Sequence, residues 1–273
     1  MHVRGLPASC RWIVVLICLT APGSGRGYAQ TTDAAQVLAA TRAALGGDER
    51  LAAVRTFIAT GRTRQVRGEN LVPIEFEIQV ELPDKYSRRD EFPAQDSGPA
   101  TSGFSGDQLI QIPRRSGQPE AALNARLAAI KQDFARLTLG MFAASFSSFP
   151  LAFDYVAQAE APQGKADVID VKGPANFAAR LFVDSESRLP IMLSWQARAA
   201  VPPPGGSRPP DRAAAATTAV EHRLYFADYR EVDGLRFPFR IRRAVGGETT
   251  EETTFDRFRL NARIDPRRFD TGN

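Results

Sequence analysis

Two stretches of the sequence hold residues of the kind that act as nucleophiles or bases: GFSGD around Ser105 and AVEHRLYF around His222. A nucleophile elbow needs the pattern G-x-S-x-G followed by a helix, whereas the second glycine here is Gly106, next to the serine, and no helix follows at once. His222 is in phase with Val220 and Leu224 in a strand-like run, and no partner that would position it as a base is evident. We therefore interpret His222 as a core or cavity-wall histidine and predict no catalytic role for Ser105.

Carboxylates and metal ligands give no stronger signal. Asp84, Asp90 and Glu91 surround one strand-like run, which is typical of a solvated face. A pair of carboxylates acting in glycoside hydrolysis is the alternative, and it depends on the distance between the two carboxyl groups in space, which the sequence does not give. The chain carries no phosphate-binding loop and no G-x-G-x-x-G pattern. With one histidine and no cysteine after residue 29, most zinc sites and Cys–His catalysis are excluded. We predict no catalytic residue, no metal and no cofactor, and hence a protein that is not an enzyme.

The first 29 residues have the pattern of a secretory signal peptide. Arg4 and Arg11 precede an apolar run at 12–19, and small residues precede a cleavage point after Ala29. The apolar run is short for a membrane span, so we expect no transmembrane segment after cleavage. Cys18 suggests a lipoprotein signal, but the residue before it is Ile17 where a small residue is needed. We predict an exported protein of the periplasm or the outer-membrane periphery.

Removing this leader changes what the composition implies. The leader contains three arginines and no acidic residue, so the formal net charge falls from +4 to +1. The remaining chain gives no reason to expect nucleic acid as a partner. Both cysteines also leave with the leader, so stability must come from a hydrophobic core. Residues 30–273 are enough for one large domain, and we expect a monomer.

The remaining chain alternates between helical and strand-like periodicity. A helical pattern after residue 33 stops at Gly46-Gly47, and strand-like runs follow, of which IEFEIQVEL at 74–82 is the clearest. The helical period returns at about Pro119, and we predict a helix to about Phe146, before the break at Pro150. About seven strand-like runs follow, separated by turn signals such as Asp233-Gly234.

This order predicts an α+β fold with a single curved antiparallel sheet of about 10–11 strands, an incomplete β-barrel whose helices cover the concave face. Pro238 interrupts one of the later strands, which places that strand at an edge or at a bulge. The segment VPPPGGSRPPD at 201–211 predicts a mobile loop between two strands of the same domain.

Three stretches give the chain a resemblance to a known family. ALGGDERLAAVRTFIATGRTR, LFVDSESRLPIMLSW with its D-x-x-x-x-L-P turn, and FADYREVDGLRFPFRIRRA followed by FDRFRLNARIDPRRFD are similar to the first helix and strand, the paired strands and the closing segment of the lipoprotein carrier superfamily. This superfamily includes outer-membrane lipoprotein-sorting proteins. The resemblance implies an incomplete barrel with a helical lid over an apolar cavity that holds acyl chains. The loop at 201–211 has no equivalent in it, and Arg62 or Arg64 are the nearest counterparts of an arginine that latches the lid.

The stretch LTLGMFAASFSSFPLAF, from Leu137 to Phe153, contains no charge and ends the long predicted helix. Its glycine, its serines and Pro150 argue against a membrane span. An ordinary core accounts for any single phenylalanine here, whereas the whole set also suits a pocket beneath a helix. The candidate cavity residues are Phe134, Leu137, Met141, Phe142, Phe146, Phe149, Phe76, Ile78, Trp195, Phe237 and Phe239.

These observations favour a non-enzymatic, exported protein that binds lipid or lipoprotein acyl chains under a helical lid, with a role in lipid or lipoprotein trafficking. One alternative is a periplasmic sensor or scaffold domain that binds an envelope protein through sheet edges or through the 201–211 loop. A hydrolase with a dispersed site is the third possibility.

Overall fold

The computed structural model of the protein describes residues 33–93, 98–114, 116–161, 164–200 and 217–271. The predicted signal peptide at 1–29 and the predicted loop at 201–211 lie outside these residues. The helices are α1 (Ala34–Ala44), α2 (Asp48–Ala53) and α3 (Glu120–Phe142), with a 3₁₀-helix, η1 (Pro266–Phe269). The strands are β1 (Thr56–Arg67), β2 (Asn70–Glu81), β3 (Lys85–Glu91), β4 (Ala100–Ser105), β5 (Gln108–Ile112), β6 (Ala152–Ala161), β7 (Gly164–Gly173), β8 (Phe177–Asp184), β9 (Pro190–Ala200), β10 (Thr217–Val232), β11 (Leu235–Val245) and β12 (Glu248–Leu260).

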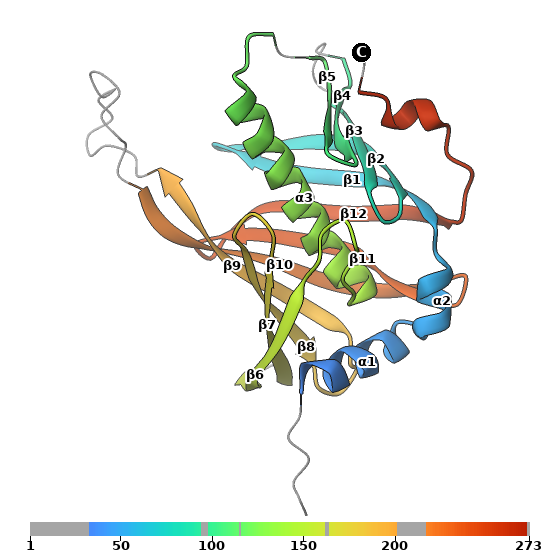
Figure 1. Ribbon diagram of the computed structural model, residues 1–273. Helices are drawn as coiled ribbons and strands as arrows, with labels where there is room; N and C mark the ends of the chain where they lie inside the picture. The colour runs from blue at the N-terminus through green and yellow to red at the C-terminus, as the bar shows by residue number, and fades with distance from the viewer. Residues whose placement is uncertain (1–32, 94–97, 115, 162–163, 201–216, 272–273) are drawn as a thin grey trace, which may run out of the picture. The chain divides into compact units, whose positions relative to one another are not determined.

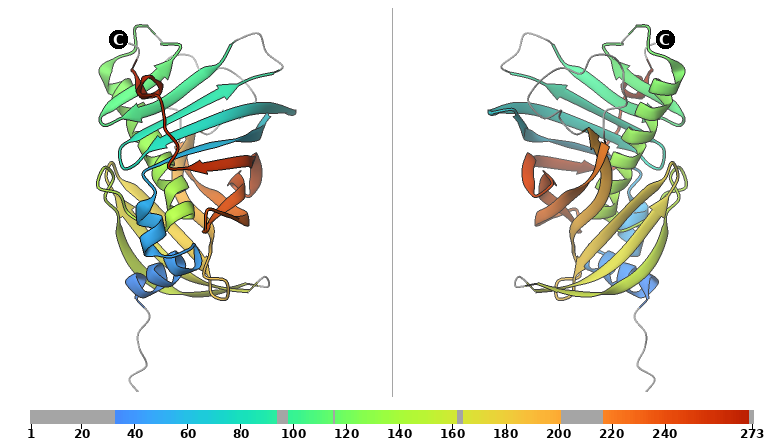
Figure 2. Two further views of the ribbon diagram at one scale, coloured as in Figure 1. Left: turned by 90° about the vertical axis from the view of Figure 1, so that its right-hand side faces the viewer. Right: turned by 90° about the vertical axis from the view of Figure 1, so that its left-hand side faces the viewer.

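The twelve strands form one antiparallel sheet in the order β5-β4-β3-β2-β1-β12-β11-β10-β9-β8-β7-β6. Every neighbouring pair except β1 and β12 is also consecutive along the chain, which agrees with the short turns of the sequence. Because β5 and β6 are edges, the sheet stays open, and it curves around α3 (Figure 1, Figure 2). The prediction of one curved antiparallel sheet is confirmed. The predicted 10–11 strands fall short of the observed twelve, in part because the start of β4 lies in a stretch that reads as a loop.

Alternation along the strands decides which side chains meet α3. In β1, Phe57 and Ala59 are buried, and the ring of Phe57 contacts Phe142 of α3. Arg62 and Arg64 have the opposite parity and are exposed, so they lie on the face away from the helix. The C-terminal segment covers part of that outer face, where η1 packs against β3 and β4 and buries Phe269.

Helix α3 ends four residues earlier than the sequence predicts. Ala143 has a left-handed conformation (φ 47°), and its N–H still donates to Leu139 O. The next residues make a turn of their own, in which Phe149 N donates to Phe146 O and the Ser145 hydroxyl accepts from Leu151 N. Polar side chains therefore hold the backbone out of the helix before Pro150 is reached.

Two neighbouring pairs of strands separate before they end. β11 pairs with β12 only from Arg240 to Val245, although β12 continues beside β1 as far as Leu260. Pro238 lies in the separated part of β11, so its missing N–H faces an opening although β11 is an inner strand. Of the two predicted alternatives, the edge position is wrong, whereas the β11–β12 ladder does contain an irregularity, between Arg243 and Ala244. Likewise, β8 pairs with β9 only from Arg180 to Val183.

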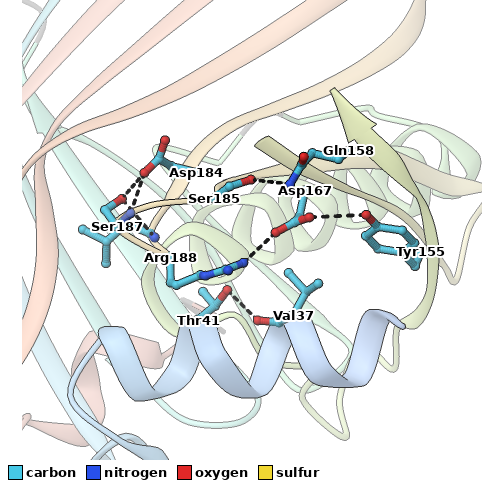
Figure 3. A network of polar contacts seen from close by, with 10 residues as sticks. Val37, Thr41, Tyr155, Gln158, Asp167, Asp184, Ser185, Ser187 and Arg188 are labelled. Carbon is cyan, nitrogen blue, oxygen red and sulfur yellow. Dashed lines mark hydrogen bonds and ion pairs between the residues drawn. The ribbon is translucent and has the colours of Figure 1, made fainter. Parts of the chain in front are cut away.

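The buried carboxylate of Asp167 on β7 holds the turn between β8 and β9 in place (Figure 3). Asp184 closes the turn by accepting bonds from the N–H and the hydroxyl of Ser187. Arg188, at φ 60°, donates from Nη1 to Oδ2 of Asp167 over 2.8 Å. The Tyr155 hydroxyl reaches Oδ1 of Asp167 over 3.3 Å. A side chain that is almost fully buried on β7 thus connects β6 to the β8–β9 turn.

Candidate functional site

Helix α3 crosses the inner face of the sheet, and its two parts are buried very differently (Figure 1). From Phe134 to Phe142 every residue except Leu137 is buried. From Glu120 to Asp133 none is buried. The C-terminal part of α3 is therefore fixed in the core, whereas the N-terminal part rests on the sheet with few apolar anchors.

A groove of about 230 Å³ lies between α3 and the middle of the sheet. Its position follows from β2, β3, β11 and β12, whose inward residues meet the helix where its burial becomes incomplete. About half of the lining is apolar or aromatic: Ile78, Tyr86, Ile130, Leu137, Leu224, Ile241 and Phe255. The rest is polar: Arg88, Ser102, Asp133, Arg243, Glu251 and Thr253.

Arg88 and Tyr86 form the polar floor of this groove on β3. The guanidinium of Arg88 lies 4.5 Å from the ring centroid of Phe76, and its Nε donates to Asp90 over 2.7 Å. Burial raises the pKa of the Tyr86 hydroxyl far above its ordinary value, and the charge of Arg88 only partly opposes this. Both groups therefore keep their protons at neutral pH and offer hydrogen-bond donors to the groove.

A second polar cluster lies on the opposite flank of α3. The guanidinium of Arg136 lies between two rings, 4.3 Å from the centroid of Trp195 and 5.2 Å from that of Phe177. Its Nη1 donates to Asp133 over 2.9 Å, and Nη1 of Arg243 lies 3.7 Å from the same carboxylate. Burial lowers the pKa of Arg136. The cluster has two guanidinium groups for one carboxylate.

His222 belongs to this second cluster. Its ring is stacked on Trp195, with 5.4 Å between the ring centroids. Partial burial lowers the pKa of His222, and the nearby charges of Arg243 and Arg136 lower it further. His222 is thus a half-buried histidine packed on a core tryptophan, which agrees with its interpretation as a core histidine, and no positioning carboxylate contacts it in the described residues.

Most of the predicted cavity residues fill the core with one another. Phe142 contacts Phe146 and Phe237 at centroid distances of 5.9 and 5.7 Å, and Met141 is fully buried. Of the predicted set only Ile78 and Leu137 line the groove, while Trp195 belongs to the second cluster. The others pack elsewhere in the core: Phe76 on Phe255, Phe134 on Tyr86 and Phe104, Phe149 on Phe177, and Phe239 on Phe258. The space beneath Met141 and Phe142 is filled by the protein itself.

Sequence reasoning missed the charged residues of the groove. Arg88 and Asp90 alternate with Ser87 and Arg89 in KYSRRDEF, so the strand pattern does place them on one face together with Tyr86. Arg243 and Glu251 lie opposite each other on β11 and β12, so they come to the same face once the two strands pair. Arg62 and Arg64, by contrast, are not brought to the helix.

The remaining candidates for chemistry do not assemble. Asp90 is paired with Arg88, and Glu91 with Arg89 over 3.0 Å. Ser105 ends β4 at a tight hairpin, opposite Gln108. The described parts of the chain contain no group of three or more histidine, cysteine, aspartate or glutamate side chains placed to hold a metal ion. Among the helices of the described residues, none has the length and apolar character needed to cross a membrane.

Comparison with known proteins finds solved structures that have a similar fold. No protein-family model matches the chain, and no curated protein matches it in sequence. Among solved structures, it is similar to a LolA superfamily protein, NE2245 from Nitrosomonas europaea, with a TM-score of 0.52 and 11% identity over 87% of this chain and 97% of the other. A putative outer membrane lipoprotein-sorting protein domain from Vibrio parahaemolyticus gives a TM-score of 0.49 and 11% identity over 87% and 97%. A DUF1329 family protein from Desulfovibrio piger gives 0.48 and 7% over 88% and 98%. The chain thus has the fold of the LolA superfamily, and the resemblance predicted from the sequence is confirmed at the level of fold.

Proposed function

We propose that this protein is an exported, non-enzymatic binding protein that holds lipid or lipoprotein acyl chains beneath α3, in the periplasm or at the outer-membrane periphery. The observation that carries the proposal is the half-apolar groove beneath α3, whose N-terminal part is much less buried than its C-terminal part. The fold shared with a LolA superfamily protein supports it. Trafficking of lipids or lipoproteins within the cell envelope is the role that follows.

The size of the groove implies that α3 moves when a chain binds. Pockets for small molecules usually have volumes of about 300–1,000 Å³, and the groove has about 230 Å³. The N-terminal part of α3 has no fully buried residue, and its apolar contacts with the core come from Leu127 and Ile130, so lifting it exposes less apolar surface than lifting the C-terminal part would. Each methylene of an acyl chain that then enters contributes roughly 0.8 kcal/mol. Several methylenes are therefore enough to favour the lifted position.

The charges of the groove favour an uncharged polar end on the ligand. Arg88 and Arg243 are matched there by Asp133 and Glu251. A free carboxylate would gain from the two arginines and lose by a similar amount to the two acids. An ester or amide carbonyl can accept hydrogen bonds from Arg88 or Tyr86 without that penalty. Acyl chains in ester or amide linkage are thus preferred over free fatty acids.

The test uses delipidated protein comprising residues 30–273 and a pyrene-labelled fatty-acid methyl ester, with the free acid as a second probe. Saturable binding of the ester, at least as tight as that of the acid, is expected. Leu137→Glu should remove this binding while the far-ultraviolet circular dichroism stays unchanged, because Leu137 lines the groove without being fully buried. Ala129→Glu is the matched control, since Ala129 is exposed on the same helix. If the parent protein takes up no probe, or if Leu137→Glu binds as tightly as the parent, the proposal fails.

A protein partner bound through a sheet edge is the second candidate function. One feature of the sheet favours it: β8 and β9 present facing edges that no strand of the described residues fills.

A further inference from the structure

The opening between β8 and β9 is bounded by two strand edges. Their ladder ends at Arg180 and Ser194. Beyond it, residues 177–179 of β8 pair only with β7, and residues 195–200 of β9 pair only with β10. Figure 1 shows β9 and β10 running away from β8 as a two-stranded ribbon. Each edge therefore keeps one side of its backbone without a ladder partner among the described residues.

The opening between β11 and β12 shows how the same sheet closes such a gap. There, the ring of Phe258 lies 5.1 Å from that of Phe237, 5.2 Å from that of Phe239 and 4.8 Å from that of Phe255. These rings are buried, and they join the separated parts of β11 and β12 through aromatic contacts. The aromatic filling also explains why Pro238 is tolerated beside it.

At the β8–β9 opening, Phe177 of β8 and Trp195 of β9 lie on either side of the Arg136 guanidinium instead of packing on each other. A cavity of about 480 Å³ lies there. Four of the side chains along the two edges are small: Ala178 and Ala179 on β8, and Ser194 and Ala197 on β9. Small side chains allow another backbone to approach both edges closely. Trp195 is the one aromatic residue among those that line this cavity.

The floor of the opening carries a buried cation. The side chain of Arg136 is 8% exposed, and its hydrogen bonds go to Gln132 and Asp133 of its own helix. Its Nε is buried and has no hydrogen-bond partner. Asp133 is shared with Arg243, so one carboxylate faces two guanidinium groups.

The other charges that line the opening are already paired. Arg180 pairs with Asp170 over 2.8 Å, and Glu221 pairs with Arg223 over 2.5 Å. Lys172 lies 3.3 Å from Asp154. Among the cations that line the opening, Arg136 is therefore the one that shares its carboxylate with a second arginine.

We propose that the β8–β9 opening is a binding site for an extended peptide segment of a protein partner, which adds as a strand to the facing edges and places a glutamate or aspartate side chain near Arg136. Backbone hydrogen bonds to residues 177–179 or 195–197 hold the peptide, and alternate side chains point to the two faces of the sheet. Arg136 supplies specificity through a charge-assisted bond from Nε. This site shares no lining residue with the acyl-chain groove, and it rests on the second candidate function given above, for which it names the partner class.

The test uses a fluorescein-labelled, capped hexapeptide of alternating valine and threonine with one central glutamate, and a twin peptide with glutamine in its place. Fluorescence anisotropy should show saturable binding, with roughly tenfold tighter binding of the glutamate peptide, as expected for one charge-assisted bond. Arg136→Gln should reduce the affinity for the glutamate peptide to that for its twin. A peptide N-methylated at alternate amides should not bind, because it cannot pair with an edge.

Ala197→Trp should block the site by filling the opening, as phenylalanines fill the other one, and Ala227→Trp on the outer face of β10 is the matched control. Amide hydrogen exchange of the unsubstituted protein gives a second measurement: the glutamate peptide should protect amides at 177–179 or 195–197. Equal binding of the N-methylated peptide, or protection confined to β5 or β6, overturns the proposal. The proposal is also overturned if Ala197→Trp binds the peptide as tightly as the parent protein but no longer binds the pyrene ester. The opening would then be part of the lipid site. Leu137→Glu should leave peptide binding unchanged, so the two proposals can fail separately.

Discussion

The backbone of Gly140 in α3 lies directly against the ring of Phe226 in β10. A Cβ placed on Gly140 would be 2.2 Å from Cε1 of that ring. At the same point the Tyr229 hydroxyl lies 3.0 Å from Gly140 O and 2.8 Å from Pro190 O. Burial raises the pKa of Tyr229 well above its ordinary value, so this hydroxyl remains a donor. Helix and sheet thus meet here at their closest, and the contact fixes the anchored end of α3.

Gly140→Ala should destabilise the protein, although alanine is the better helix former. The gain in helix propensity is about 1 kcal/mol, whereas forcing an extra methyl group into a packed core typically costs about 1–3 kcal/mol. Because the neighbouring atoms belong to an aromatic ring in a buried cluster, we expect a net loss of stability. Urea unfolding, followed by circular dichroism, measures it.

Phe226→Ala provides the control for this prediction. In the double variant the overlap disappears, so the combined loss should be smaller than the sum of the two single losses. Additive losses, or a Gly140→Ala protein more stable than its parent, would show that the helix and the ring have room to separate.

The buried pair of Asp167 and Arg188 predicts an asymmetry between its two partners. Arg188→Ala leaves a buried carboxylate with Tyr155 as its remaining partner, and such a loss costs about 3–5 kcal/mol. Asp167→Ala leaves Arg188, which is partly exposed and can turn to solvent, so this loss should be smaller. The difference in unfolding free energy between the two variants is the measured quantity.

Arg180→Ala is the comparison for that pair. Arg180 is bound to Asp170 over a similar distance, but both side chains are substantially exposed, and such pairs contribute about 0–1 kcal/mol. If Arg188→Ala costs no more than Arg180→Ala, the carboxylate of Asp167 must have gained water or another partner.

The periodicity of the sequence was enough for the sheet but not for the site. In β2 the alternation of Phe76, Ile78 and Val80 predicts the inward face that the structure shows, because strand period depends only on neighbours along the chain. β4 was harder to recognise, since its start reads as a polar loop and its Gly103 packs tightly against the backbone of Tyr86 across the ladder.

The groove could not be located from the sequence because it depends on where α3 crosses. Phe142 and Leu137 are one and a half helical turns apart and equally apolar, yet Phe142 meets three rings and Leu137 meets open space. That difference follows from the curvature of the sheet and from the close contact at Gly140. Similarly, the helical pattern places Arg136 on α3 but says nothing of the two rings on either side of it.

The rings between β11 and β12 should behave as a structural plug. Phe258→Ala removes a side chain that contacts Phe237, Phe239 and Phe255, and truncation of a buried phenylalanine costs about 3–5 kcal/mol. Phe258→Leu keeps most of the volume and should lose much less. Calorimetric unfolding compares the two variants, and similar losses for both would mean that the opening closes without the ring.

His222 should make the protein less stable in weak acid. Its pKa is lowered from the ordinary value of 6.5 by partial burial and by Arg243 and Arg136, with Asp133 opposing them. Between its folded-state pKa and about 6.5 the unfolded chain binds more protons, so stability falls as the pH decreases through this window and then levels off. His222→Gln should remove this part of the pH dependence, measured as the difference in urea midpoint between parent and variant from pH 7.5 to pH 5.

Trp195 offers an independent measurement of the same titration. It is the single tryptophan of residues 30–273, and its ring is stacked on His222. Since a protonated imidazole quenches indole emission, the fluorescence of the native protein should fall with a midpoint below pH 6.5, and His222→Gln should abolish the transition. A midpoint above pH 6.5 would mean that Asp133 outweighs the two arginines, and stability would then increase rather than decrease as His222 gains its proton.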